Sequence, residues 1–305
     1  MIKIIFIFCG ALILPLWPQL VSAKPVQVTD YLGNNVILEQ PARRVVSLAP
    51  HITENLFALG LGSTIVGTVE YSDYPYAALD IPRIGGAYTL SLEKIISQKP
   101  DLVYVWLSGN GDTIAKRLKS FGIPVYLDNP KTLNDIPRSL KDLSVLGGKP
   151  QKGDDSAQLF SNRLAQLEKD FSKNSLDIPL RSFFQVWRQP LQTLSGKSIV
   201  SDLIKRCGGS NIFADEEAVA PTVSIESVIK RDPEIIFTGD SAIQVSVNET
   251  TEDERFWAAY PNISAVKNQR IVRLNPDHIH RHSPRILLGM NDICKAIAEN
   301  STVAP

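Results

Sequence analysis

Short apolar runs alternate with amphipathic stretches along the first half of the chain. Strand-like apolar runs occupy residues 45–48, 65–69 and 102–105, and an amphipathic pattern over 52–59 ends at Gly60. Glycine commonly ends a helix, and buried strands that alternate with helices are typical of parallel α/β layers. The pattern therefore predicts an α/β domain, preceded by a short N-terminal hairpin with Gly-Asn-Asn at its turn.

A long helical stretch separates this half from a second one of the same kind. Over residues 154–173 the apolar positions fall at i, i+4, i+7 and i+11, which is one face of a helix. These positions are Phe160, Leu164, Leu167 and Phe171. At about 1.5 Å per residue such a helix spans roughly 30 Å, enough to join two lobes. Strand patterns at 183–187 and 234–238 and a helical pattern at 201–206 then repeat the alternation.

An internal repeat relates the two halves. Residues 91–103 and 224–236 align without a gap, and each copy shows a serine N-cap, a short helix with an early glutamate, a proline and a buried strand. Two similar lobes joined by one helix imply a cleft between them, the usual place for a small-molecule site. The predicted organisation is an N-terminal α/β lobe at 24–150, an interdomain helix at 151–175 and a C-terminal α/β lobe at 176–305.

The first 23 residues have the pattern of a secretory signal. Lys3 is their only charge, residues 4–14 are apolar, and small residues precede a cleavage site after Ala23. A membrane anchor is the alternative, but two prolines leave the apolar run short of the roughly 20 residues that cross a bilayer. We expect an exported, periplasmic protein.

Cysteine usage agrees with export. Of three cysteines, Cys9 lies in the signal, so Cys207 and Cys294 remain as an even pair in an oxidising compartment. This predicts a disulfide between them, with two buried free thiols as the alternative.

Charge and motifs exclude several function classes. The chain has 32 basic and 32 acidic residues, so it lacks the basic excess that nucleic acids or anionic membranes attract. It contains no G-x-S-x-G elbow, P-loop, H-E-x-x-H or G-x-G-x-x-G sequence. We therefore expect a binding protein rather than an enzyme.

The histidines are the main feature that favours an enzyme instead. Three of the four histidines lie within residues 277–282, with His51 far off in the sequence. Imidazoles with a carboxylate are zinc ligands, which keeps an exported zinc-dependent hydrolase as an alternative. Ligands so close together on an extended segment are sterically awkward, so we expect no metal site.

Aromatic residues mark the expected crevice. Tyr71, Tyr74, Tyr88, Trp106 and Trp187 lie at or just past predicted strand ends, where side chains of α/β lobes face a cleft. Such rings suit a flat apolar ligand, although each ring is equally able to pack within its own lobe. A Ser-Gly-Asn-Gly sequence after Trp106 predicts that this ring emerges at a loop.

Glu93 and Glu226 occupy matching places in the repeat. An acid in the first turn of a helix is stabilised by the helix dipole, which is one explanation. The other is that one exposed carboxylate on each lobe docks onto arginines of a two-fold symmetric partner.

Five short segments carry a recognisable pattern. They are 44–54 (R-V-V-S-L-A-P-H-I-T-E), 70–75 (E-Y-S-D-Y-P), 99–103 (K-P-D-L-V), 207–209 (C-G-G) and 283–285 (S-P-R). From about Arg44 to its end, the chain resembles a known family, the periplasmic vitamin B12-binding proteins of cobalamin ABC importers. K-P-D-L-V marks the wider class of binding proteins with a helical linker, whereas the first two segments are specific to the cobalamin branch.

The resemblance implies two Rossmann-like α/β lobes joined by a single long rigid helix, with a corrinoid carried in the cleft as cargo and no cofactor. It implies a protein that is monomeric when free and passes the ligand to a dimeric permease, where Glu93 and Glu226 dock, and it pairs Cys207 with Cys294. Ligand-binding residues expected from the motifs and from position are Tyr71, Tyr88, Trp106, Trp187, Asp277, His278, Ile279, His280 and Arg281.

Two positions depart from the best-known members of that family. Ala87, beside Tyr88, and His278 stand where those members carry tryptophans, so we expect His278 or His280 to hydrogen-bond a corrin amide instead, with ligation of the cobalt as the alternative. The alternative cargo is haem or a ferric siderophore. Siderophores are usually anionic, and Arg188, Arg281 and Arg285 keep that alternative open.

Overall fold

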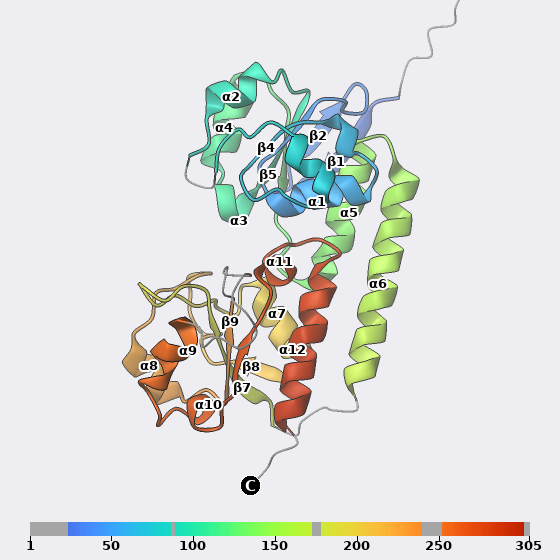
Figure 1. Cartoon of the computed structure of the whole chain (residues 1–305). Helices are drawn as coiled ribbons and strands as arrows, with labels where there is room; N and C mark the ends of the chain where they lie inside the picture. The colour runs from blue at the N-terminus through green and yellow to red at the C-terminus, as the bar shows by residue number, and fades with distance from the viewer. Residues whose placement is uncertain (1–23, 87–88, 173–177, 240–251, 302–305) are drawn as a thin grey trace, which may run out of the picture.

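Two α/β lobes lie one above the other in Figure 1, with a long helix running alongside both. This computed structural model describes residues 24–86, 89–172, 178–239 and 252–301. The predicted signal at 1–23 and Tyr88 lie outside the described residues. Within the described ranges, no helix combines the length and the apolar composition needed to cross a membrane.

A four-stranded parallel sheet forms the centre of the N-terminal lobe. Its strands are β3 (Val45–Ser47), β4 (Ile65–Thr68), β5 (Leu102–Trp106) and β6 (Val125–Asp128), in the order β4-β3-β5-β6. The helices are α1 (Pro50–Ala58), α2 (Leu92–Ser97), α3 (Leu107–Asn110), α4 (Thr113–Ser120) and α5 (Ile136–Leu146), with 3₁₀ turns η1 (Gly62–Thr64), η2 (Tyr76–Asp80) and η3 (Leu133–Asp135). The predicted hairpin is β1 (Val26–Thr29) paired antiparallel with β2 (Asn35–Leu38).

The C-terminal lobe repeats this plan. Its strands are β7 (Leu180–Gln185), β8 (Gly209–Asn211), β9 (Ile235–Thr238) and β10 (Ile271–Arg273), in the order β8-β7-β9-β10. Its helices are α7 (Ile199–Arg206), α8 (Ile225–Arg231), α9 (Glu252–Ala258), α10 (Ser264–Lys267), α11 (Pro276–Ile279) and α12 (Ile286–Ser301). In both lobes the second strand lies at one edge, next to the first, and the third lies on the first strand's other side.

Matching backbone details confirm the internal repeat. Ser91 Oγ and Ser224 Oγ each accept a hydrogen bond from the backbone N–H three residues on, at 3.2 Å. Such N-caps typically stabilise a helix by about 1 kcal/mol. Lys99 and Asp232, which precede the two prolines of the repeat, both adopt left-handed backbone conformations, with φ of 47° and 41°.

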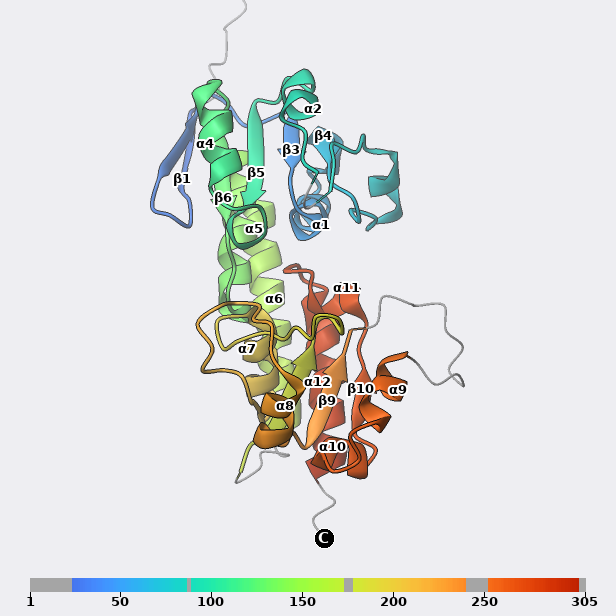
Figure 2. The same ribbon diagram turned by 90° about the vertical axis from the view of Figure 1, so that its left-hand side faces the viewer.

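Helix α6 (Pro150–Ser172) joins the lobes, and Figure 2 shows it passing from one to the other. Phe160 and Leu164 are buried, while Leu167 and Phe171 pack against the same hydrophobic cluster, which confirms the predicted apolar face. A side chain at Gly153 would lie 1.9 Å from Ser144 Oγ, so glycine permits the close packing of α5 on α6.

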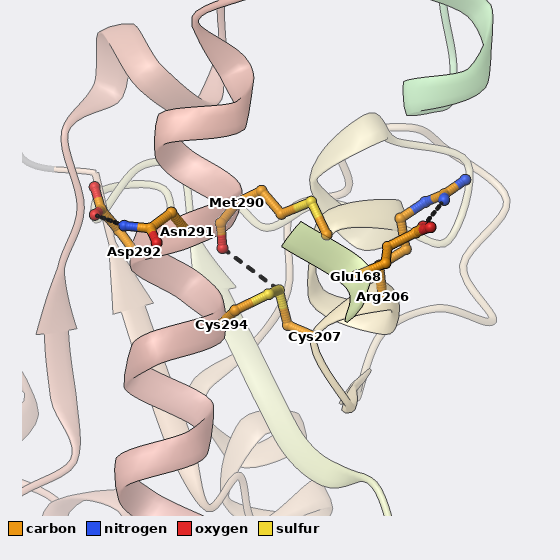
Figure 3. Close-up of a disulfide and its surroundings, with 7 residues drawn as sticks. All are labelled: Glu168, Arg206, Cys207, Met290, Asn291, Asp292 and Cys294. Atoms are coloured by element: carbon orange, nitrogen blue, oxygen red, sulfur yellow. Dashed lines mark hydrogen bonds and ion pairs between the residues drawn. A yellow bond between two sulfur atoms is a disulfide. The ribbon is translucent and has the colours of Figure 1, made fainter. Parts of the chain in front are cut away.

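A disulfide ties the last helix to the body of the C-terminal lobe (Figure 3). Cys207 directly follows α7, and Cys294 lies within α12. Their sulfur atoms are bonded across a sequence separation of 87 residues, and both side chains are buried. The predicted pairing is confirmed, and the free-thiol alternative is wrong.

Strand β7 ends earlier than the sequence pattern predicts. It stops at Gln185 rather than at residue 187, and Trp187 instead forms an isolated antiparallel bridge with Gln192. The chain therefore turns back on itself where the predicted strand would have continued.

Two predicted irregular or extended segments are short helices. The residues after Trp106 form α3 rather than a loop, and the Asn110 side chain accepts a 2.9 Å hydrogen bond from the Trp106 backbone N–H. The segment starting at Asp277 is helical through α11 rather than extended, because Asn275 caps it by accepting a 2.9 Å bond from Asp277 N and Pro276 occupies its first turn.

Candidate functional site

The lobes meet through a charged network around Glu54 of α1. Its carboxylate, in a residue that is 4% exposed, accepts hydrogen bonds from Ser283 Oγ at 2.6 Å and from Arg285 Nε and Nη2 at 3.1 and 2.9 Å. Arg281 Nε lies 3.9 Å from the same carboxylate, and the Arg285 guanidinium stands 3.8 Å from the centre of the Tyr74 ring. Two guanidiniums of the C-terminal lobe thus compensate one buried carboxylate of the N-terminal lobe.

A cluster of rings lies beside this network and also bridges the lobes. His51 of α1 and His282 have ring centroids 5.0 Å apart, and Trp106 meets them edge-on at 5.3 and 5.4 Å. Asn55 Nδ2 donates a 3.2 Å hydrogen bond to the His282 carbonyl oxygen. Behind His51, its Nε2 atom is 3.5 Å from Asp128 Oδ2. The ends of β5 and β6 therefore contribute to the same interface as the segment before α12.

Trp106 is the most firmly positioned of the candidate ligand-binding rings. It ends β5, and its indole covers Gly109, where a Cβ atom would lie 2.0 Å from the ring. Glycine at that position therefore lets the indole lie against the backbone of α3. The ring is only partly buried and lies at the carboxyl end of the sheet, where α/β lobes bind ligands.

The side chains of Tyr71 and Trp187 are more exposed to solvent than that of Trp106. Tyr71 is 76% exposed and has a positive φ of 62°, and Trp187 is 59% exposed with its Nε1–H donating to the Gln189 carbonyl at 2.9 Å. A left-handed non-glycine residue is a form of backbone strain found most often at binding sites. Exposed aromatic rings on the two lobes are what a flat ligand between them requires.

The residues of the segment 277–281 are all buried or half-buried, and two of them are held by contacts within the protein. Asp277 and Arg281 form an ion pair at 2.9 Å, and Arg281 is only 8% exposed. Ile279 is fully buried in the hydrophobic core, so its side chain is not available to a ligand. His278 and His280 are half-buried, and the His280 ring meets Phe184 edge-on at 5.7 Å. Burial, with the nearby Arg281, lowers the pKa of His280 to about 4.

A cavity of about 620 Å³ opens on the other side of the charged network, along α6 and α12. Its lining comes from four parts of the molecule: α1, the segment between β4 and η2, α6, and the start of α12 with the segment before it. Glu54, Tyr74, Arg163 and Arg285 contribute its polar and aromatic lining. None of the eight predicted ligand-binding residues that the structure describes lines it, although Tyr74, one of the aromatic residues that mark the expected crevice, does.

The candidate docking acids are on the surface. Glu93 and Glu226 are exposed, in the first turns of α2 and α8. Ser91 Oγ donates a 3.1 Å hydrogen bond to Glu93 Oε2. Hydrogen bonds from its own backbone N–H and from Ser224 lower the pKa of Glu226, so this carboxylate stays ionised at neutral pH.

The histidines of 277–282 are separated by the fold. His280 packs on Phe184, whereas His282 packs on His51 and Trp106. Among the described residues, no group of three or more histidine, cysteine and acidic side chains is placed to share a metal ion.

Sequence reasoning missed the interface contacts themselves. In the sequence, Glu54 and Ser283 stand out only as parts of motifs, Arg285 also as a cation that an anionic cargo would need, and His282 only as one of a run of histidines. Contacts between residues more than 200 positions apart leave no local pattern in the sequence.

Comparisons with known proteins agree with this architecture. The family model described as periplasmic binding protein matches residues 45–278. The vitamin B12-binding protein of Vibrio cholerae serotype O1 is 37% identical over 255 residues, which is 83% of this chain and 88% of the relative. The protein of the same name from Pectobacterium atrosepticum is 33% identical over 259 residues, covering 84% and 89%.

Solved structures show the same two-lobed fold. The crystal structure of the periplasmic vitamin B12-binding protein BtuF of Vibrio cholerae matches 86% of this chain and 99% of its own, with 37% identity and a TM-score of 0.77. The periplasmic heme-binding protein RhuT from Roseiflexus sp. RS-1 matches 86% of this chain with a TM-score of 0.74 but only 24% identity, so it supports the fold alone.

Proposed function

Because the chain belongs to the periplasmic binding protein family, we propose that it captures cobalamin or a related corrinoid and delivers it to an ABC transporter permease. The observation that carries this proposal is the similarity, over most of the chain, to relatives named for vitamin B12 binding. The expected signal sequence supports the periplasm as the place of capture.

Capture requires complementary surfaces and no bond-making chemistry. Trp106 from the N-terminal lobe and Trp187 from the C-terminal lobe offer aromatic rings to a large flat ligand, and the exposed Tyr71 ring adds a third. Asp277, His278 and His280 add groups able to hydrogen-bond corrin amides. The corrinoid is cargo, and the protein needs no cofactor of its own to bind it.

A ferric siderophore is a weaker candidate because the arginines that favoured it have partners. Arg281 is paired with Asp277, and Arg285 with Glu54. Arg188 Nη1 lies 3.7 Å from Asp253 Oδ1. An anionic siderophore calls for uncompensated positive charge in the cleft, and these three guanidiniums already face carboxylates.

Delivery calls for a surface that the permease recognises on both lobes. Glu93 and Glu226 are exposed at equivalent places of the repeat, one on each lobe. A pair of this kind matches a two-fold symmetric permease dimer that presents one cationic site to each lobe.

Binding by the cleft is tested with a pair of aromatic variants. Trp106→Ala removes a ring at the proposed site, and we expect cyanocobalamin affinity to fall by about 2 kcal/mol, roughly 30-fold, as for a central aromatic contact. Tyr76→Ala removes a ring that is 83% exposed and lies on η2, and it serves as the matched control. Equal affinities of the two variants would contradict the placement of the ligand against Trp106.

A further inference from the structure

Several polar atoms at the lobe interface lack a hydrogen-bond partner within the described part of the chain, although they are buried. They are His51 Nε2, Asn55 Oδ1, Trp106 Nε1, Asp128 Oδ2 and His282 Nδ1. Burying polar atoms without partners is costly, so a cluster of them indicates a constraint other than stability.

The cluster couples the orientation of one indole to the separation of the lobes. His51 belongs to the N-terminal lobe and His282 to the C-terminal lobe, and both meet the same Trp106 ring at nearly right angles, 88° and 87°. The two imidazoles lie 5.0 Å apart, tilted by 35°. Moving the lobes apart therefore removes one of the two rings that support Trp106.

The two imidazoles have different neighbours. His51 Nε2 lies 3.5 Å from Oδ2 of the fully buried Asp128. His282 has no ion pair with a carboxylate in the described part of the chain, and its Nδ1 atom is inaccessible to solvent. Burial, together with His51 and His280, holds the pKa of His282 well below its ordinary value.

The other charged groups do not offset a proton on His282. Glu54, on α1, is already bonded to Arg285 and lies near Arg281. Both arginines belong to the segment before α12, which also carries His280. Among the ion pairs of the described residues, the carboxylate that contacts the ring cluster is Asp128, on the side of His51. Charging His282 therefore places a cation among cations and buried rings.

We propose that His51 and His282 are positioning residues that hold Trp106 and the two lobes in the binding arrangement while His282 is neutral, and that protonation of His282 in acid releases this contact. Separating the lobes returns the imidazole to water, where its positive form is favoured. Acid therefore shifts the population toward the separated arrangement. The proposal rests on the proposed function only for the role of Trp106 in holding the corrinoid.

A ligand-free measurement tests the contact itself. The tryptophan emission of the protein is recorded between pH 4 and pH 8, and the emission of the Trp106→Phe variant is subtracted to isolate Trp106. We expect a one-proton transition below the ordinary histidine pKa of about 6.5. The transition should be absent in His282→Asn and retained in His278→Asn, whose histidine is in the same segment but has no ring contact with Trp106 among the contacts described. A transition that persists in His282→Asn overturns the proposal.

The same variants separate this inference from the proposed function. Cyanocobalamin affinity should fall as pH drops below about 6, by at most about tenfold per pH unit because one proton is taken up, and the fall should disappear in His282→Asn. A fall of equal slope in His282→Asn overturns the proposal. Absence of cobalamin binding at every pH, with the emission transition still dependent on His282, would contradict the proposed function while supporting the pH-sensitive contact.

Discussion

Replacing Glu54 by alanine tests whether the charged network holds the lobes together. The substitution removes a carboxylate that accepts three hydrogen bonds, from Ser283 Oγ and from two nitrogen atoms of Arg285, at 2.6 to 3.1 Å. It leaves the Arg285 guanidinium, together with the nearby Arg281, without its buried counter-charge. We expect unfolding to become easier by about 3–5 kcal/mol, as when one partner of a buried pair is removed.

Glu54→Gln separates charge from shape. The two bonds from Arg285 go to different carboxylate oxygens, and glutamine keeps one of these acceptors but replaces the other by an NH2 donor. One bond therefore weakens from a charged to a neutral hydrogen bond and the other is lost, for an expected loss of about 2–3 kcal/mol. The glutamine variant should therefore lie between the original protein and the alanine variant.

Urea unfolding under non-reducing conditions at pH 7 measures both variants. Glu217→Ala is the matched control, because Glu217 pairs with Lys197 but its side chain is 94% exposed, and exposed pairs contribute only about 0–1 kcal/mol. A Glu54→Ala protein that loses no more stability than the control would refute the reasoning that a buried ion pair joins the lobes.

Three further predictions concern the disulfide, the docking acids and pH. The disulfide between Cys207 and Cys294 closes a loop with a sequence separation of 87 residues. Replacing both cysteines by serine should therefore lower the free energy of unfolding by about 4–5 kcal/mol in the chain-entropy model. An unchanged urea midpoint would contradict this prediction. Replacing Glu93 and Glu226 by alanine should leave cobalamin affinity within about twofold, since both residues lie outside the cleft. The double variant should bind the permease more weakly in a pull-down. Normal transport by the double variant would favour the helix-dipole explanation. The pKa of His280 in the folded protein is lowered to about 4, so below pH 6.5 the unfolded chain binds more protons than the folded protein. The free energy of unfolding should therefore fall by about 2–3 kcal/mol between pH 6.5 and pH 4. A His280→Asn protein with the same pH dependence would show that other groups cause this fall.

Local patterns predicted most of the regular structure. The repeat at 91–103 and 224–236 combined caps, prolines and apolar strands, and each of these features acts within a few residues of itself. Helix α6 could also be predicted from the sequence, because its apolar residues recur with helical spacing. The disulfide followed from an even cysteine count and the expected compartment.

What the sequence did not predict depends on short turns and long-range contacts. The expected extended segment at 277–282 begins as helix α11, for which Asn275 and Pro276 are a helix start. Burial of Ile279 depends on packing against residues distant in sequence. Two contacts join the N-terminal and C-terminal lobes, that of Glu54 with Arg285 and that of His51 with His282. Only the tertiary structure brings these side chains together.

Calorimetric titration of the purified protein with cyanocobalamin at neutral pH tests the central claim most directly. The account predicts tight binding of one cobalamin per protein, with the corrin's visible absorption retained by the protein after desalting. Absence of cobalamin binding, with tight binding of haem or a ferric siderophore in the same experiment, would contradict it.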